Sequence, residues 1–363
     1  MRIGLIAPPW LSVPPARYGG TERVVDVLAR GLRAAGEEVV LFSTGDATCP
    51  VPRRYAYAEP IEPMGTTIPE LYHVRCAYEA LARCDIVHDH TVAGPVWAAT
   101  RPTPPVVATN HSPYTRELGA LYADAGTHVA IVAISHSQRA TAPGVPIAAV
   151  IHHGLDPDRF PVGRGDGGYV LFLGRLSPEK GASRAIRIAR AAGVPLRIAG
   201  RVQETVEREY FDRRIRPALG PEVEFLGELG SEDCARQLGG AVALLNPIRW
   251  NEPFGLVMIE ALACGTPVIT RPVGAAPEIV QHGVTGYLCT SFRQAVQAVT
   301  SAPALDRGCC RGAVEGHFSA ARMVAQHTAL YRRVCHANRS ATRLRRQGPD
   351  SWPAAVPIDR PTG

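Results

Sequence analysis

The stretch "PVGRGDGGYVLFLGR" (residues 161–175) divides the sequence into two halves of similar pattern. Its glycine-rich part, residues 163–168, is typical of a linker, and the apolar run that follows at 169–173 is typical of a buried strand. On both sides, short apolar runs alternate with amphipathic segments, as in parallel strands joined by crossover helices. A chain of 363 residues suits two such domains. We therefore predict an α/β protein with two doubly wound domains that face each other across a deep cleft.

The alternation also predicts individual elements and boundaries. The expected strands are 3–7, 38–42, 85–88, 106–109, 129–133 and 148–151 in the first half and 169–173, 196–199, 223–225, 241–245 and 268–270 in the second. The expected helices include 21–35, 69–83, 183–192, 256–263 and 319–336. We expect an N-terminal domain at 1–162, a C-terminal domain at 163–318, a helix at 319–338 that packs back on the N-terminal domain, and a tail at 339–363. The tail has several prolines and no apolar period, so we expect it to be disordered.

The composition limits the class of protein. With 46% hydrophobic and 20% charged residues, the chain can bury two cores. A net charge of +6 fits an anionic ligand better than a dedicated nucleic-acid binder, so we expect no nucleic-acid partner. Nine cysteines without a CxxC pair indicate reduced thiols and neither a disulfide framework nor a zinc site.

The first ten residues, "MRIGLIAPPW", contain an apolar run too short for a signal peptide. No stretch approaches the roughly 20 apolar residues that span a bilayer. We expect a cytoplasmic protein, with peripheral contact to the inner membrane face left open.

The segment "LGRLSPEKGA" places Arg175 and Lys180 in a loop between a predicted strand and a helix. Unpaired backbone N–H groups at the helix start, next to two cations, would form a phosphate site. The alternative is an ordinary loop with two solvated charges. Lys180 is the only lysine among 39 basic residues, which suggests a position that arginine does not serve.

A second loop and helix start lie in "WNEPFGLVMIEALACGTPV" (residues 250–268). Gly255 allows a close turn into the helix, whose first N–H groups can also bind an anion. Glu252 and Glu260 flank this start and would repel phosphate, but carboxylates accept hydrogen bonds from sugar hydroxyls. The alternatives are an exposed helix glutamate at 260 and a glutamate at 252 that is favoured only by the helix dipole.

Two further features lie at predicted strand ends. Gly19 and Gly20 precede the first helix and would let a ligand approach the backbone, although no GxGxxG fingerprint is present. Histidines occur in "VHDH" (His88 and His90), "TNHS" (His111) and "IHHG" (His152 and His153). Metal binding is one interpretation, but no third ligand group is evident, and hydrogen bonding in the cleft fits better. His153 before a glycine also suggests a left-handed turn.

Together these motifs resemble the retaining glycosyltransferases of family 4, which have the GT-B fold of two Rossmann-like domains. The resemblance covers nearly the whole chain up to the tail. It rests on the Gly-Gly loop, "IVHDH", "TNH", "GRLSPEKG", "EPFGLVMIEALACGTPVI" and "FSAARMVAQHTALYRRV". The chain departs from the family pattern at His152-His153-Gly154 and in "NPIRW" before Glu252.

The resemblance implies roles for the candidate residues. Arg175 and Lys180 would hold the diphosphate of a nucleotide sugar and stabilise the departing charge. Glu260 would bind the ribose hydroxyls and Glu252 the transferred sugar. The further donor contacts would come from Gly19, Gly20, Phe254, Gly255 and Leu256. His111 would lie near the reacting carbon, so that the expected catalytic residues are Arg175, Lys180, His111 and Glu252.

The implied reaction moves a hexosyl-type sugar from a nucleoside-diphosphate sugar, UDP- or GDP-linked, to an acceptor hydroxyl on a glycan, lipid or small metabolite. No cofactor and no metal is expected, in agreement with the lack of a DxD motif. Two alternatives stay open: a sugar-nucleotide epimerase or phosphorylase on the same fold, and a non-catalytic nucleotide-sugar-binding module.

Overall fold

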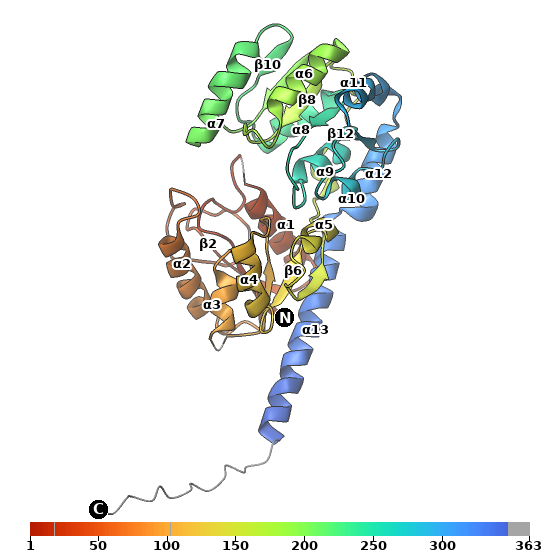
Figure 1. The fold of residues 1–363 in the computed structure, drawn as a ribbon. Helices are drawn as coiled ribbons and strands as arrows, with labels where there is room; N and C mark the ends of the chain where they lie inside the picture. Colours follow the sequence, from red (N-terminus) through yellow and green to blue (C-terminus); the bar gives the residue numbers. More distant parts are fainter. Residues whose placement is uncertain (18, 102, 348–363) are drawn as a thin grey trace, which may run out of the picture.

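The computed structural model describes residues 1–17, 19–101 and 103–347, which form two lobes with a long C-terminal helix beside them (Figure 1). Within these residues, the N-terminal domain contains a seven-stranded sheet in the order β3-β2-β1-β4-β5-β6-β7. The C-terminal domain contains a six-stranded sheet in the order β10-β9-β8-β11-β12-β13. Neighbouring strands are parallel in both sheets. The predicted α/β fold with two doubly wound domains is confirmed.

Helices and strands alternate along most of each domain. The N-terminal domain comprises β1 (Arg2–Ile6), α1 (Gly20–Ala34), β2 (Glu38–Ser43), β3 (Arg53–Tyr55), α2 (Thr67–Ala80), β4 (Ile86–Asp89), α3 (Gly94–Ala99), β5 (Val106–Thr109), α4 (Arg116–Ala125), β6 (Ala130–Ala133), α5 (His136–Ala140) and β7 (Ile147–Val150). The C-terminal domain comprises β8 (Val170–Leu173), α6 (Ala182–Ala192), β9 (Leu196–Ala199), α7 (Thr205–Tyr210), β10 (Val223–Phe225), α8 (Ser231–Gly240), β11 (Leu244–Asn246), α9 (Leu256–Ala263), β12 (Val268–Thr270), α10 (Ala276–Ile279), β13 (Gly286–Leu288), α11 (Phe292–Ser301) and α12 (Arg307–His317).

The sheets are buried on both faces because helices cover each side. In β1, Ile3 and Leu5 belong to a core cluster with residues of α1, whereas Ile6 belongs to a separate cluster with Val74 of α2. Neighbouring strand residues point to opposite faces, so one short strand contributes to two cores. This explains why the strands read as continuous apolar runs.

The predicted strands all occur within a few residues of their expected bounds, but β3 and β13 were not predicted. Both are three-residue strands at sheet edges. β3 has the sequence Arg-Arg-Tyr and is largely exposed, so it carries no apolar signal. Edge strands of this kind are commonly short and charged.

The predicted linker at residues 163–168 is part of the C-terminal domain. The Gly163 N–H donates to the Cys264 carbonyl at 3.0 Å, and the Gly165 N–H donates to the Gly239 carbonyl at 3.0 Å. The chain passes between the domains near Leu155, whose N–H donates to the Phe318 carbonyl at 3.0 Å. Glycine composition alone did not distinguish a free linker from a segment whose backbone is paired.

The last helix, α13 (Ala320–Gln347), runs back along the N-terminal domain (Figure 1). Met323, Val324, Leu330 and Tyr331 share a core cluster with α1 and β1. Residues 339–347, expected in the tail, continue this helix, and the rest of the predicted tail, 348–363, lies outside the described residues. Among the described residues, no helix is both long and apolar enough to cross a bilayer.

Candidate active site

Arg175 and Lys180 lie in the loop between β8 and α6, at the carboxyl end of the sheet. Gly181 caps α6 with a φ of 85°. A Cβ at this position would lie 2.5 Å from the Pro247 carbonyl oxygen, so only glycine lets the two loops approach. The turn therefore places Lys180 at the start of α6, where the Ser183 N–H donates to the Tyr210 hydroxyl at 3.0 Å.

Glu252 lies just before α9, in the facing loop. Its Oε2 accepts hydrogen bonds from Lys180 Nζ at 2.5 Å and from Trp250 Nε1 at 2.9 Å. Lys180 Nζ also lies 4.9 Å from the centre of the Trp250 ring. Gly255, with a φ of 98°, caps α9 and directs its first N–H groups toward the same space. The segment "NPIRW" thus supplies an aromatic wall that holds the lysine and the carboxylate together.

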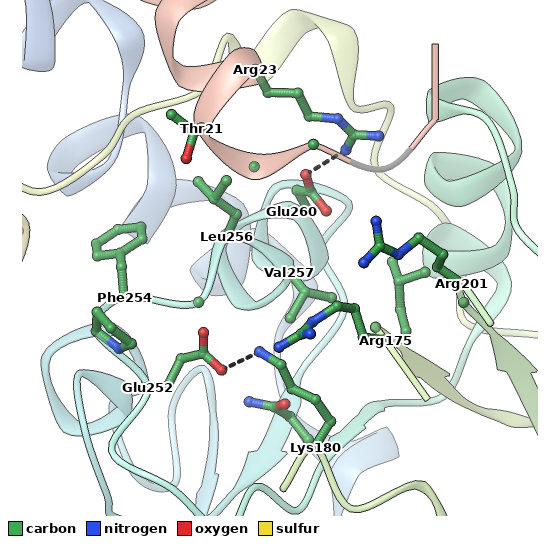
Figure 2. Close-up of a pocket in the computed structure, with 18 of the residues that line it drawn as sticks. Thr21, Arg23, Arg175, Lys180, Arg201, Glu252, Phe254, Leu256, Val257 and Glu260 are labelled. Atoms are coloured by element: carbon green, nitrogen blue, oxygen red, sulfur yellow. Dashed lines mark hydrogen bonds and ion pairs between the residues drawn. The ribbon is translucent and has the colours of Figure 1, made fainter. Parts of the chain in front are cut away.

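Glu260 lies in the second turn of α9 and is buried, not an exposed helix glutamate. Its Oε1 accepts a hydrogen bond from Nη1 of Arg23 in α1 at 3.0 Å, which links the two domains (Figure 2). Gly20 lies at the start of α1, and a Cβ there would lie 3.3 Å from Leu256 Cδ1. The starts of α1 and α9 therefore meet across the cleft.

A cavity of about 520 Å³ lies between these elements. It is lined by all of the residues predicted for the site: Gly19, Gly20, His111, Arg175, Lys180, Glu252, Phe254, Gly255, Leu256 and Glu260. Sequence reasoning thus found residues from both domains that share one cleft. Their individual roles in binding and catalysis remain predictions.

The cavity also contains charged residues that sequence reasoning missed, notably Arg23, Arg201 and Glu228. Arg201 Nη2 lies 3.7 Å and Arg175 Nη1 lies 3.6 Å from Oε1 of Glu207, which is almost fully buried. Arg201 follows the end of β9 by two residues, much as Arg175 follows β8. This position after a strand was a usable signal, because ligands bind at carboxyl ends of parallel strands.

Histidines from separate segments lie together on the side of the cavity that the N-terminal domain forms. His111 and His153 line it, with their rings stacked at 5.1 Å. His90 Nδ1 lies 2.8 Å from His111 Nε2, so one of the two nitrogens carries the shared proton.

Behind these rings, His88 Nε2 lies 2.8 Å from the Thr109 hydroxyl and His88 Nδ1 lies 2.7 Å from the Tyr331 hydroxyl. His152 is directed elsewhere, to Glu278 at 2.7 Å.

Burial keeps His88, His90, His111 and His153 neutral. Loss of solvent, with a smaller effect of nearby His327, lowers the pKa of His111 to about 3. Burial likewise lowers the pKa values of His88, His90 and His153 well below 6.5. The predicted left-handed turn at His153 is wrong, because positive φ angles among the described residues occur only at glycines. His153 is instead a buried wall of the cavity.

The arrangement suits an anion with attached hydroxyls. Arg175, Lys180 and Arg201 approach the cavity together with the N-terminus of α9, while Glu252 and Glu260 offer acceptors. Within the described residues, no group of three or more His, Cys, Asp or Glu side chains is arranged to hold a metal ion.

Two family models together match most of the chain. The model described as Glycosyltransferase Family 4 matches residues 18–159, and the model described as Glycosyl transferases group 1 matches residues 156–302. The chain is a member of glycosyltransferase family 4. The boundary between the two matches falls where the chain of this family member passes from one domain to the other.

Relatives of this family member include several named glycosyltransferases. A phosphatidyl-myo-inositol mannosyltransferase of Mycobacterium leprae is 28% identical over 318 residues, which cover 79% of this chain and 83% of the relative. A glycogen synthase of Mycobacterium tuberculosis is 34% identical over 176 residues. That match covers 45% of this chain and only 42% of the synthase.

Solved structures agree with the GT-B fold. A glycosyltransferase involved in avilamycin A biosynthesis is 28% identical, with a TM-score of 0.71 over 92% of this chain and 98% of that chain. Anabaena HepE in complex with UDP and glucose is 19% identical, with a TM-score of 0.72 over 91% of this chain and 99% of that chain. At this identity the second likeness supports the fold alone.

Proposed function

We propose that the protein is a retaining glycosyltransferase that moves a hexosyl-type sugar from a nucleoside-diphosphate sugar to an acceptor hydroxyl. One observation carries the proposal. Arg175 and Lys180 approach the N-terminus of α9 in a cleft that also contains two carboxylates, Glu252 and Glu260, at opposite ends of that helix start. A nucleotide sugar has a diphosphate between the hydroxyls of its ribose and those of its transferred sugar. Its groups therefore follow the same order as the cleft, where the cations and the helix start lie between two carboxylates.

In this proposal the diphosphate binds between the cations and the first N–H groups of α9. Charge that develops on the leaving phosphate is stabilised by Arg175 and Lys180. Glu260 accepts hydrogen bonds from the ribose and Glu252 from the transferred sugar. The neutral His111 can donate or accept a hydrogen bond near the reacting carbon, but its low pKa makes it a poor base at neutral pH.

Retention of configuration follows from attack on the face that the diphosphate leaves. The acceptor oxygen bonds to the anomeric carbon as the bond to the phosphate oxygen breaks, and the departing phosphate takes the acceptor proton. This path needs no nucleophile from the protein, and catalysis then comes mainly from positioning and charge stabilisation. The UDP and glucose held by the similarly folded HepE make a UDP-sugar the first donor to test.

The test is a thermal-shift series with UDP, GDP, ADP and TDP and their sugars, followed by product analysis with the stabilising donor. A ligand at 100 times its Kd should add about 2.7 kcal/mol to the free energy of unfolding. Transfer with retained anomeric configuration supports the proposal. Absence of stabilisation by every nucleotide contradicts it, and turnover that requires inorganic phosphate or no acceptor indicates a phosphorylase or an epimerase.

Activity should survive removal of divalent metal ions. Arg175 and Lys180 supply the positive charge that a metal would otherwise provide to the diphosphate. Initial rates with excess EDTA should equal those without it within about twofold. Loss of activity in EDTA that manganese restores would show that a metal ion takes part.

Replacing the only lysine by arginine should lower kcat/KM at least about tenfold, or about 1.4 kcal/mol of transition-state stabilisation. Lys180 Nζ is confined between the Glu252 carboxylate and the Trp250 ring, and its side chain is only 19% exposed. The planar guanidinium is bulkier and differs in geometry, so it should not fit this space without displacing one neighbour.

Steady-state kinetics of Lys180→Arg measures this effect, with melting temperature as a check on folding. Arg213→Lys is the matched control, because the Arg213 side chain is 77% exposed and should tolerate the exchange. Wild-type kinetics in Lys180→Arg would mean that the lysine has no special task.

A further inference from the structure

A second cavity, of about 110 Å³, lies within the C-terminal domain behind the donor-side loops. It lies between α6, the end of β12, the start of α11 and the segments that follow β11, β12 and β13. Arg184 of α6 and Arg271 after β12 line it, and no aspartate or glutamate of the described residues does. We name this cavity the arginine pocket.

Two further arginines, both exposed, lie near Arg184. Arg187 follows Arg184 by one turn of α6, and Arg249 follows β11. Burial and the positive charges of Arg249, Arg271 and Arg187 lower the pKa of Arg184. The Arg184 guanidinium therefore lies close enough to three other guanidinium groups to be repelled by them, which costs free energy in the folded chain.

Among the described residues, none of these four arginines forms an ion pair. Arg271 makes one long hydrogen bond, 3.4 Å to the Ile248 carbonyl, and Arg187 lies 5.3 Å from the Phe292 ring. Arg307 of the same domain shows the usual arrangement, since its guanidinium donates to four carbonyls and a threonine hydroxyl. Within the described part of the chain, the single long bond of Arg271 is the only such hydrogen bond that the four arginines make.

The pocket also offers hydrogen-bond donors suited to an anion. Ser291, the N-cap of α11, accepts a hydrogen bond from the Gln294 N–H at 3.2 Å, while its own hydroxyl proton donates to no described residue. Thr290 and Phe292 complete this side. The Gln294 side chain accepts hydrogen bonds from the Thr290 and Ser291 N–H groups, so among the described residues the N–H groups of Phe292 and Arg293 are the ones left without an acceptor at the start of α11. A helix start with a serine cap and arginines opposite is a suitable arrangement for a phosphate group.

We propose that the arginine pocket binds one phosphate group, either inorganic phosphate or the phosphate of a small monoester. The volume is several times the roughly 30 Å³ that a water molecule occupies, which admits a single phosphate but not a nucleotide. The site is separate from the donor cleft, although the two share a wall. Pro247 lines the pocket, whereas Asn246 at the end of β11 and Trp250 in the following loop line the cleft.

The experiment is titration calorimetry of the full chain with inorganic phosphate and, separately, glycerol 3-phosphate, at constant ionic strength in chloride. Since phosphate can also enter the donor cleft, two double variants are compared. We expect phosphate binding to persist in Arg175→Gln/Lys180→Gln and to weaken at least tenfold in Arg184→Gln/Arg271→Gln. Tighter binding of glycerol 3-phosphate than of inorganic phosphate would identify a monoester as the ligand, and the reverse would identify the free ion.

The pocket variant should fold, because its arginines have few partners to lose, and its melting temperature in phosphate-free buffer should equal or exceed that of the wild type. Arg249→Gln, at an exposed position, is a second variant and should weaken phosphate binding at least twofold. The proposal is overturned if the wild type binds no phosphate at millimolar concentration, or if binding is lost only in the cleft variant. Because binding is measured directly, failure of the glycosyltransferase proposal would leave this result interpretable.

Discussion

At pH 5.5 the protein should melt at least about 10 °C below its melting temperature at pH 7.5. The cause is a set of histidines that folding buries in their neutral form. Burial lowers the pKa of His73 and His327 from 6.5 to about 4, and that of His111 to about 3. Burial also holds the pKa values of a second group well below 6.5: His88, His90 and His153.

Between pH 6.5 and about 4, the unfolded chain protonates these side chains while the folded chain keeps them neutral. The unfolded state then binds more protons, so the free energy of unfolding falls as the pH falls. Each such histidine contributes about 1.4 kcal/mol per pH unit in this window. Two buried acids oppose the trend, because burial raises the pKa of Glu22 to about 7 and that of Asp89 to about 6. The histidines outnumber them, and the net effect is a loss of several kcal/mol.

Melting temperatures at pH 7.5, 6.5 and 5.5 measure this effect, and His73→Gln tests its origin. His73 Nε2 lies 2.9 Å from the Ala7 carbonyl, and a glutamine amide can donate in its place. The variant removes one titrating group, so its free energy of unfolding should fall less steeply, by about 1.4 kcal/mol per pH unit. A melting temperature that stays constant or rises toward pH 5.5 would contradict the expectation.

Truncation of Glu252 should abolish transfer while leaving nucleoside-diphosphate binding nearly intact. Glu252→Ala should lower kcat/KM at least about a thousandfold, or about 4 kcal/mol, because it removes an acceptor for sugar hydroxyls. Lys180 and Trp250 both donate to this carboxylate. Its loss leaves Lys180 free to face the diphosphate, so the Kd of the free nucleotide should not rise.

Truncation of Glu260 should instead weaken the binding of the nucleoside diphosphate itself. If Glu260 binds the ribose hydroxyls, Glu260→Ala should raise the Kd of the nucleoside diphosphate at least about tenfold. This variant also breaks the ion pair with Arg23, 3.0 Å away in the other domain. Arg23→Gln is the matched control, because it removes the same ion pair and keeps the carboxylate.

Titration calorimetry and steady-state kinetics of the three variants separate these effects. Arg23→Gln should change nucleotide affinity less than Glu260→Ala does. Equal losses of affinity in Glu252→Ala and Glu260→Ala would disprove the separate roles, and equal losses in Glu260→Ala and Arg23→Gln would assign the effect to the link between domains.

Local sequence determined the units from which the site is built. Apolar runs predicted the parallel strands, and the glycines at 181 and 255 marked the starts of α6 and α9, where both have left-handed φ angles. Such signals depend on neighbours in the chain, so they can be read without the fold. The family motifs added the order of these units, and every residue predicted for the site lines one cavity.

Tertiary structure decided what depends on the packing of distant segments. Arg23 and Glu260 are 237 positions apart, and they meet because the starts of α1 and α9 face each other across the cleft. The histidine cluster joins β4 and the segments that follow β4, β5 and β7 to α13, and burial there, not sequence spacing, sets its low pKa values. The paired backbone at residues 163–168 and the four arginines around the second cavity were likewise invisible in the sequence. A short motif specifies a turn, but charge pairing and burial depend on which elements the two sheets bring together.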